Sequence, residues 1–189
     1  MRKLLNALGA ALALGLALGL TPTPANAAAP AMPSDTAGQL TMAEMITEDS
    51  TFIDAATLAA IGCGQVCDYK NPASYRIYYN SCTTCYYYCA DDAITPSPLA
   101  NYDKRTSSAS IELRYSPRCR TAWARTTWGA SYFYVESRYL SGSHRATAGF
   151  TKEDYGTNYT AMLNDADLQA RACMPNHGPV TGTLCTSWY

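Results

Sequence analysis

Eight cysteines lie downstream of an apolar N-terminal leader, and this arrangement constrains the fold more than any other feature of the 189-residue chain. Thiols pair in the oxidising compartments outside the cytosol, and an even number of cysteines in an exported chain indicates a disulfide framework. We therefore expect an extracellular domain that depends on covalent bridges. The cysteines are Cys63, Cys67, Cys82, Cys85, Cys89, Cys119, Cys173 and Cys185.

The leader has the three parts of a secretory signal peptide. Arg2 and Lys3 give a positive start, residues 4–20 form an apolar run, and Ala25-Asn26-Ala27 fits the small-residue cleavage rule. A retained membrane helix is the alternative, but the run is short for a full span and no basic flank follows it. We expect cleavage after Ala27 and a secreted protein with no integral membrane segment after processing.

The charge balance argues against polyanionic partners. The whole chain has a formal net charge of −1, and removal of residues 1–27, with two basic and no acidic side chains, brings it to −3. A chain of this charge has no electrostatic basis for binding nucleic acid or an anionic membrane surface.

The remaining chain is long enough for one domain with its own core. Residues 28–40, which are mostly Ala, Pro, Ser and Thr, predict a flexible leader, and residues 41–189 predict a single disulfide-stabilised domain. Thr41 and Glu44 have the spacing of a capping box, which predicts a short helix through Ile46.

A second short helix is predicted over residues 52–61, with Gly62 as its stop. Further along, alternating apolar and polar residues predict short strands, and Ser141-Gly142-Ser143 predicts a hairpin turn between two of them. The fold class is therefore mainly β: a small disulfide-rich β-sandwich or barrel-like domain with short N-terminal helices. The predicted strands cover residues 111–115, 133–139, 159–163, 169–174 and 183–188.

One disulfide can be assigned from the residues alone. Cys173 and Cys185 flank a turn-rich loop, Pro175 to Pro179, that can bring the two cysteines into bridging range. Closing a loop of this length would stabilise the fold by about 3 kcal/mol.

Two other roles for the cysteines compete with disulfides. Cys63 and Cys67, together with Cys82 and Cys85, superficially have the spacing of a four-thiolate zinc site, and Cys82-Thr83-Thr84-Cys85 has that of a redox motif. An oxidising location argues against zinc, and no thioredoxin-like βαβ pattern surrounds the second motif. We expect structural bridges, with no metal and no cofactor.

Several blocks resemble an actinobacterial family of secreted proteins, the domain of unknown function 2690 family. The most specific block is residues 111–125, with Arg114-Tyr115-Ser116-Pro117-Arg118-Cys119 followed by Trp123. Weaker blocks are residues 63–72, 89–95, 164–173 and 185–189.

The resemblance implies a secreted or surface-exposed domain, and it carries no known activity and no catalytic residues. It also implies that Cys63, Cys67, Cys89 and Cys119, which lie in family-like blocks, pair among themselves, preferably with a Cys89–Cys119 bridge. Residues 78–88 resemble an insertion, which leaves Cys82 to pair with Cys85.

No catalytic motif is found. The chain has two histidines, His144 and His177, and neither lies in a Gly-x-Ser-x-Gly or His-Glu-x-x-His pattern. Asp91 and Asp92 are adjacent and more typical of a cap or turn than of a carboxylate pair across a cleft. A secreted hydrolase would have to assemble its site from distant residues, for which the candidates are His144, His177, Glu136, Asp154, Asp165 and Asp167.

Tyrosine supplies the main binding hypothesis. The chain has 15 tyrosines and three tryptophans, and a secreted domain can use such rings to stack on sugars or peptides. The alternative is that the rings fill the core, which we expect for Tyr115, Tyr139, Trp123 and Trp188. The candidate ligand-binding residues are Tyr78, Tyr79, Tyr86, Tyr87 and Tyr88.

The function predicted from sequence is thus a non-enzymatic extracellular or cell-envelope domain. Its candidate partners are a cell-wall glycan or a secreted protein. The alternatives are the hydrolase and a protease inhibitor that presents the loop of residues 175–184.

Overall fold

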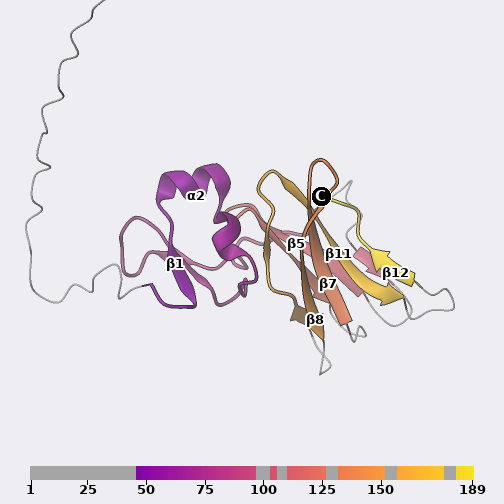
Figure 1. The fold of residues 1–189 in the computed structure, drawn as a ribbon. Coiled ribbons are helices and arrows are strands. Elements are labelled where there is room, and N and C mark those ends of the chain that lie inside the picture. Colours follow the sequence, from indigo (N-terminus) through magenta and orange to yellow (C-terminus); the bar gives the residue numbers. More distant parts are fainter. Residues whose placement is uncertain (1–45, 97–102, 106–109, 127–131, 152–156, 177–181) are drawn as a thin grey trace, which may run out of the picture. The chain divides into compact units, whose positions relative to one another are not determined.

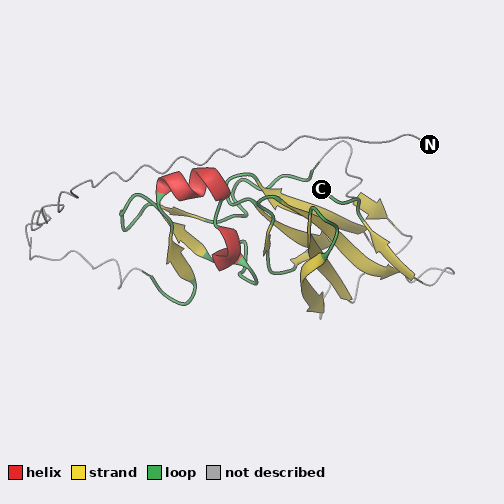
Figure 2. Cartoon of the chain, turned by 45° about the horizontal axis from the view of Figure 1, so that its top comes forward, coloured by secondary structure: helices red, strands yellow, loops and turns green. Residues whose placement is uncertain are grey.

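The structure, a computed structural model, describes residues 46–96, 103–105, 110–126, 132–151, 157–176 and 182–189. These residues belong to one compact unit and are mainly β, with three sheets, one short α-helix and one 3-10 helix (Figure 1 and Figure 2). The predicted signal peptide and flexible leader lie outside the described residues.

Two antiparallel sheets carry most of the fold. The five-stranded sheet has the order β10-β6-β5-β4, with β9 also paired to β6, and the four-stranded sheet has the order β12-β11-β7-β8. The strands are β4 (Asp103–Arg105), β5 (Ser110–Ser116), β6 (Thr121–Thr126), β7 (Tyr132–Tyr139), β8 (His144–Thr151), β9 (Asn158–Tyr159), β10 (Leu163–Asn164), β11 (Leu168–Asn176) and β12 (Gly182–Cys185).

These two sheets pack face to face as a β-sandwich. Side chains alternate between the faces of a strand, so Ile111 and Leu113 of β5 point toward Phe133 and Val135 of β7. Half of the shared core is alanine, so it buries little apolar area for its size. The core consists of Ile111, Leu113, Ala122, Ala124, Phe133, Val135, Ala146, Ala148, Leu163, Ala170, Ala172 and Met174.

Strand β6 is buried on both of its faces. Ala122 and Ala124 join the sandwich core, whereas Trp123 between them points to the other side and is only 3% exposed. There it enters a second core built around sulfur. The buried members of this disulfide core are Ile53, Leu58, Cys63, Cys67, Tyr75, Ile77, Tyr87, Cys89, Cys119, Trp123 and Met162.

The N-terminal sheet covers the disulfide core together with the helix. It consists of β1 (Ser50–Phe52), β2 (Arg76–Tyr78) and β3 (Tyr86–Tyr87), with β1 parallel to β2 and β3 antiparallel to it. Helix α2 (Ala55–Ile61) begins after Asp54, whose carboxylate accepts a 2.8 Å hydrogen bond from the Thr57 N–H. A 3-10 helix, Gly64–Cys67, follows it.

The predicted pair of N-terminal helices is not confirmed. Of residues 41–46 only Ile46 is described, and it is not helical. The second helix is shorter than predicted because Phe52 ends β1 and the chain turns into α2 only after Asp54. Among the described residues, no helix is long and apolar enough to cross a membrane.

The predicted strands over residues 111–115, 133–139 and 169–174 fall within β5, β7 and β11 and are confirmed. Gly142 (φ +90°) lies in the turn between β7 and β8 as expected. The predicted strand over residues 159–163 is wrong: it consists of the ends of β9 and β10. Between them the Met162 N–H donates to the Lys70 carbonyl oxygen instead of to a neighbouring strand.

The last predicted strand ends early, since β12 stops at Cys185. Residues 186–189 nevertheless follow β11, because the N–H groups of Thr186 and Tyr189 donate to the carbonyl oxygens of Ala172 and Ala170. The described strands form open sheets, so the sandwich form of the prediction is correct and the barrel form is not.

Gly62 lies directly against the backbone of Cys119. It has φ +64°, and a Cβ atom there would lie 2.0 Å from the carbonyl oxygen of Cys119. The neighbouring Cys63 N–H donates to that same oxygen at 2.9 Å. Only glycine allows the chain to pass here, which explains why the helix stops at this residue.

We predict that Gly62→Ala lowers the free energy of unfolding by on the order of 3 kcal/mol, since it adds a backbone clash to an unfavourable φ. Gly142→Ala is the matched control: φ is also positive, but no atom lies within 4 Å of the added Cβ. That variant should lose only about 1 kcal/mol. Chemical denaturation of both variants measures the difference, and equal losses would contradict the proposed close approach.

Candidate ligand-binding site

All eight cysteines form disulfides. The bridge predicted from the residues, Cys173–Cys185, joins directly opposed positions of β11 and β12. The pairing implied by the family resemblance is also present. The other bridges are Cys63–Cys67, Cys82–Cys85 and Cys89–Cys119.

The alternative zinc site is not assembled as its spacing suggested. Cys63 and Cys67 are bridged to each other, and so are Cys82 and Cys85. The sulfurs that lie near Cys63 belong to Cys89 and Cys119 instead.

The five candidate tyrosines flank the β2–β3 hairpin but do not form one exposed surface. Tyr86 is exposed (39%), Tyr78 and Tyr87 are buried, and Tyr79 and Tyr88 are half-buried. The Tyr86 ring centroid lies 5.5 Å from that of Tyr78 and 5.6 Å from that of Tyr88. Tyr79 and Tyr87 form a separate pair, 5.8 Å apart.

The four rings assigned to the core have different positions. Trp123 is buried as predicted, and Tyr115 is half-buried against the sandwich core. Tyr139 is 48% exposed, so its core assignment is wrong: it ends β7, where the hairpin turn leaves the sheet. Trp188 is half-buried between the guanidinium groups of Arg138 and Arg171, at 4.0 and 4.3 Å.

A hollow of about 350 Å³ lies beside the Tyr79–Tyr87 pair. One wall is a small apolar face of α2, and the opposite wall is the turn between β5 and β6. The hollow is lined by Ala55, Leu58, Ala59, Tyr79, Asn80, Pro117 and Arg118.

Arg118 is held over both rings of that tyrosine pair. The centre of its guanidinium lies 3.7 Å from the Tyr87 ring centroid and 4.9 Å from that of Tyr79. Burial raises the pKa of Tyr87 well above its usual value, and its hydroxyl has no hydrogen-bond partner among the described residues. The ring pair therefore supports an exposed cation from below.

The turn that carries Arg118 is fixed by Asp92. Its carboxylate accepts hydrogen bonds from the Ser116 hydroxyl and from the Arg118 N–H, the latter at 2.8 Å. The Ser116 Oγ in turn accepts a 3.0 Å bond from the Cys119 N–H. The prediction that Asp91 or Asp92 caps a turn is thus confirmed, and the cap orients Arg118.

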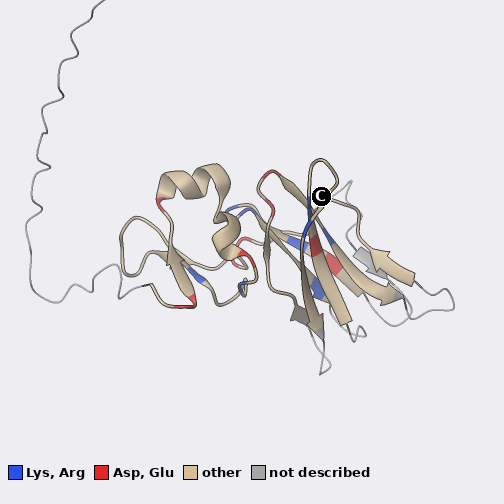
Figure 3. Cartoon of the chain, in the orientation of Figure 1, with Lys and Arg blue, Asp and Glu red and all other residues tan. Residues whose placement is uncertain are grey.

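The other arginines of the same segment have partners. Arg125 pairs with Glu112 at 2.6 Å, Arg120 with Asp167 at 3.1 Å, and Arg114 donates to the Ala93 carbonyl oxygen. Figure 3 shows that acidic and basic positions occur together on the sandwich strands. Within the described part of the chain, the guanidinium of Arg118 forms no ion pair with a carboxylate.

The hydrolase candidates that lie within the described residues share no hydrogen bond with one another. The Nε2 atom of His144 lies 2.9 Å from the Thr147 Oγ1 on an exposed edge, and no described carboxylate hydrogen bonds to it. Glu136 pairs with Arg171 at 2.7 Å. His177 and Asp154 lie outside the described residues, as does half of the loop proposed for an inhibitor.

Sequence comparison assigns the chain to a protein family. The family model described as protein of unknown function (DUF2690) matches residues 65–173, more than half of the sequence. The chain belongs to this family. No curated protein and no solved structure is detectably similar to it.

The match with the DUF2690 family covers only part of the hollow. Tyr79, Asn80, Pro117 and Arg118 lie inside the matched residues, whereas the α2 wall precedes them. The family-like ending at residues 185–189 lies beyond the matched segment.

One buried acid was not recognised as such from the sequence. Asp165 is 7% exposed, and its Oδ1 has no hydrogen-bond partner in the described structure. Burial raises its pKa to about 8, although the charges of Arg120 and Arg145 act in the opposite direction. At neutral pH Asp165 is therefore mostly a neutral acid.

We predict that stability falls as the pH rises from about 4 to 8. In the unfolded chain Asp165 has the ordinary aspartate pKa of 3.8, whereas in the folded chain its pKa of about 8 means that it retains the proton up to that pH. The folded state therefore binds more protons in this window, and the free energy of unfolding should fall by up to about 1.4 kcal/mol per pH unit.

Asp165→Asn should flatten this pH profile, as measured by denaturation between pH 5 and 8. Asp167→Asn is the control, because Asp167 is two residues away but exposed. An unchanged slope in Asp165→Asn would contradict the assignment of the retained proton to Asp165.

Proposed function

We propose that this protein is a secreted, non-enzymatic binding domain whose ligand occupies the hollow beside Arg118. A single observation carries the proposal: a guanidinium without an ion-pair partner is fixed on two tyrosine rings at the edge of an apolar-walled hollow. Arg114, Arg125 and Arg171, by contrast, donate to carboxylates or carbonyls of the fold itself.

The chemistry of the lining favours a ligand with an anionic group on a largely apolar or ring-shaped body. Arg118 offers several N–H donors to a carboxylate, and Tyr79 offers a ring face for stacking. Asn80 adds both a donor and an acceptor, while the alanines of α2 leave room for the ligand. A volume of about 350 Å³ is at the lower end of small-molecule sites, so a sugar or a short peptide end fits.

The predicted location suggests where such a ligand occurs. A signal peptide and eight bridged cysteines support export to an oxidising compartment. We therefore propose a carboxylate-bearing glycan or peptide of the cell envelope. The absence of a His–carboxylate pair in the described residues supports a binding role over hydrolysis.

The test compares the affinity of the protein for soluble peptidoglycan fragments, which carry carboxylates, with its affinity for chitin oligomers, which are neutral. We expect the wild-type protein to bind the former only, and Arg118→Gln to weaken binding roughly 10- to 100-fold, since a charge-assisted hydrogen bond contributes about 1.5–3 kcal/mol. Calorimetry or a pull-down gives the affinities.

Arg138→Gln is the matched control. Arg138 also stacks on an aromatic ring, 4.0 Å from Trp188, but it does not line the hollow. Its affinity should equal that of the wild type. Equal weakening by both substitutions, or tight binding of chitin, would refute the site as described.

Processing gives a separate prediction. The protein recovered from the culture medium should begin at Ala28, and its eight cysteines should resist alkylation until a reductant is added. N-terminal sequencing and mass spectrometry measure both. An unprocessed chain inside cells with reactive thiols would contradict the proposed location.

A further inference from the structure

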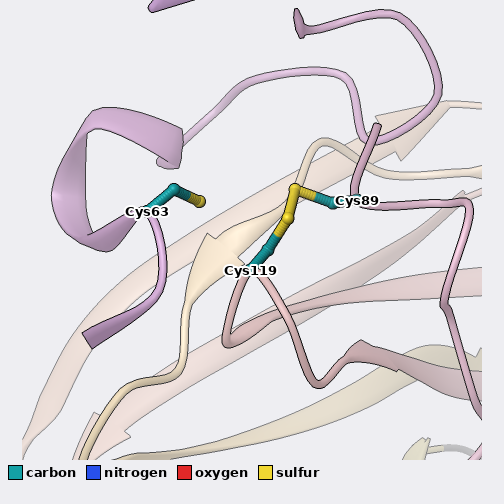
Figure 4. A group of neighbouring side chains, drawn as sticks. All are labelled: Cys63, Cys89 and Cys119. Carbon is teal, nitrogen blue, oxygen red and sulfur yellow. A yellow bond between two sulfur atoms is a disulfide. The ribbon is translucent and has the colours of Figure 1, made fainter. Parts of the chain in front are cut away.

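We propose that Cys63 and the Cys89–Cys119 bridge form a buried thiol–disulfide exchange site that couples the redox states of two disulfides. The Sγ atoms of Cys63, Cys89 and Cys119 all lie within 4.8 Å of one another. In Figure 4 the sulfur of Cys63 points toward the bridge between the other two cysteines. This inference does not depend on the proposed ligand.

The backbone, and not a disulfide bond, holds Cys63 beside the Cys89–Cys119 bridge. Cys63 is bridged to Cys67 and not to Cys89 or Cys119. The Cys63 N–H donates to the Cys119 carbonyl oxygen at 2.9 Å, directly after the tight passage at Gly62. On the other side, the Ala90 N–H donates to the Pro72 carbonyl oxygen at 2.9 Å, next to Cys89. The sulfurs should therefore stay close when one bridge is opened.

The exchange step is a nucleophilic substitution at sulfur. A Cys63 thiolate attacks one sulfur of the Cys89–Cys119 bridge, a new bond from Cys63 to that sulfur forms, the Cys89–Cys119 bond breaks, and the second sulfur leaves as a thiolate. The numbers of thiolates and bridges are unchanged, so the step requires no oxidant. In the native chain the Cys63 thiolate arises when an external dithiol gives two electrons to the Cys63–Cys67 bridge and becomes a disulfide.

Burial favours exchange inside the protein over reaction with external thiols. Cys67, Cys89 and Cys119 are 0% exposed and Cys63 is 4% exposed. A thiolate at Cys63 meets the neighbouring bridge at high effective concentration and therefore outcompetes a solvent thiol for that bridge. The external dithiol attacks at Cys63, which is the one of these four cysteines that retains exposure. Reduction of the Cys63–Cys67 bridge, which joins residues four apart, is thereby coupled to opening of the Cys89–Cys119 bridge, which joins residues 30 apart.

The Cys82–Cys85 bridge offers an internal comparison. Both residues are only half-buried, and their sulfurs belong to no such cluster in the described residues. A thiol created there has no neighbouring bridge to attack.

The test places a thiol at Cys63 by the substitution Cys67→Ser. The purified variant is incubated at pH 8, quenched in acid, alkylated in acidic denaturant and mapped by peptide mass spectrometry. We expect part of the label on Cys89 or Cys119, together with the new bridges Cys63–Cys119 or Cys63–Cys89. In the control, Cys85→Ser, all of the label should stay on Cys82. Label on Cys63 alone in the first variant would overturn the proposal.

A second measurement avoids the substitution of a buried residue. Wild-type protein is titrated with dithiothreitol at pH 8 until the Cys63–Cys67 bridge opens in part of the sample, and it is mapped in the same way. The proposal requires mixed bridges between Cys63 and Cys89 or Cys119. Detection of only the four native bridges and their reduced forms would overturn it, whatever the outcome of the peptidoglycan experiment.

Discussion

The hydrogen bond from the Cys63 N–H to the Cys119 carbonyl oxygen is the contact on which the rest of the structure depends. It can form only because Gly62 has no side chain at the point where a Cβ would lie 2.0 Å from that oxygen. The same turn of the chain carries Arg118, so the contact fixes the guanidinium relative to α2. It also sets the spacing of the sulfurs in the disulfide core. The Cys89–Cys119 bridge secures a geometry that the backbone has already defined.

The two cores support each other through β6. The sandwich core is rich in alanine and would be weak alone, because small side chains remove little apolar area from water. The disulfide core on the other side of β6 adds Trp123, Met162 and two bridges. A domain with two cores on opposite sides of one strand needs a covalent bond close to that strand. The Cys89–Cys119 bridge lies there, in the turn that leads into β6. The half-buried Cys82–Cys85 bridge only closes the β2–β3 hairpin.

Sequence reasoning reached the parts of the fold that are encoded locally. Alternation predicted β5, β7 and β11, and Gly142 predicted the hairpin turn. It failed where long-range contacts decide: residues 159–163 look like a strand, yet Met162 bonds to Lys70, far away in sequence. The hollow could not be foreseen for the same reason, since Tyr79 and Arg118 are distant in sequence and α2 supplies the third wall. The tyrosine run lies at the β2–β3 hairpin beside the hollow, but its rings form two separate groups that differ in burial, and only Tyr79 lines the hollow.

Burial of β6 on both faces has a consequence for how such a chain can change over evolutionary time. Most strands at a surface tolerate replacement on one side, whereas Ala122, Trp123 and Ala124 each contact an interior. A larger residue at either alanine would press on the opposing sheet, and a smaller one at Trp123 would leave a void against the sulfurs. Divergence at this strand would therefore require compensating replacements on both sides at once, while the hairpin tips remain free to vary.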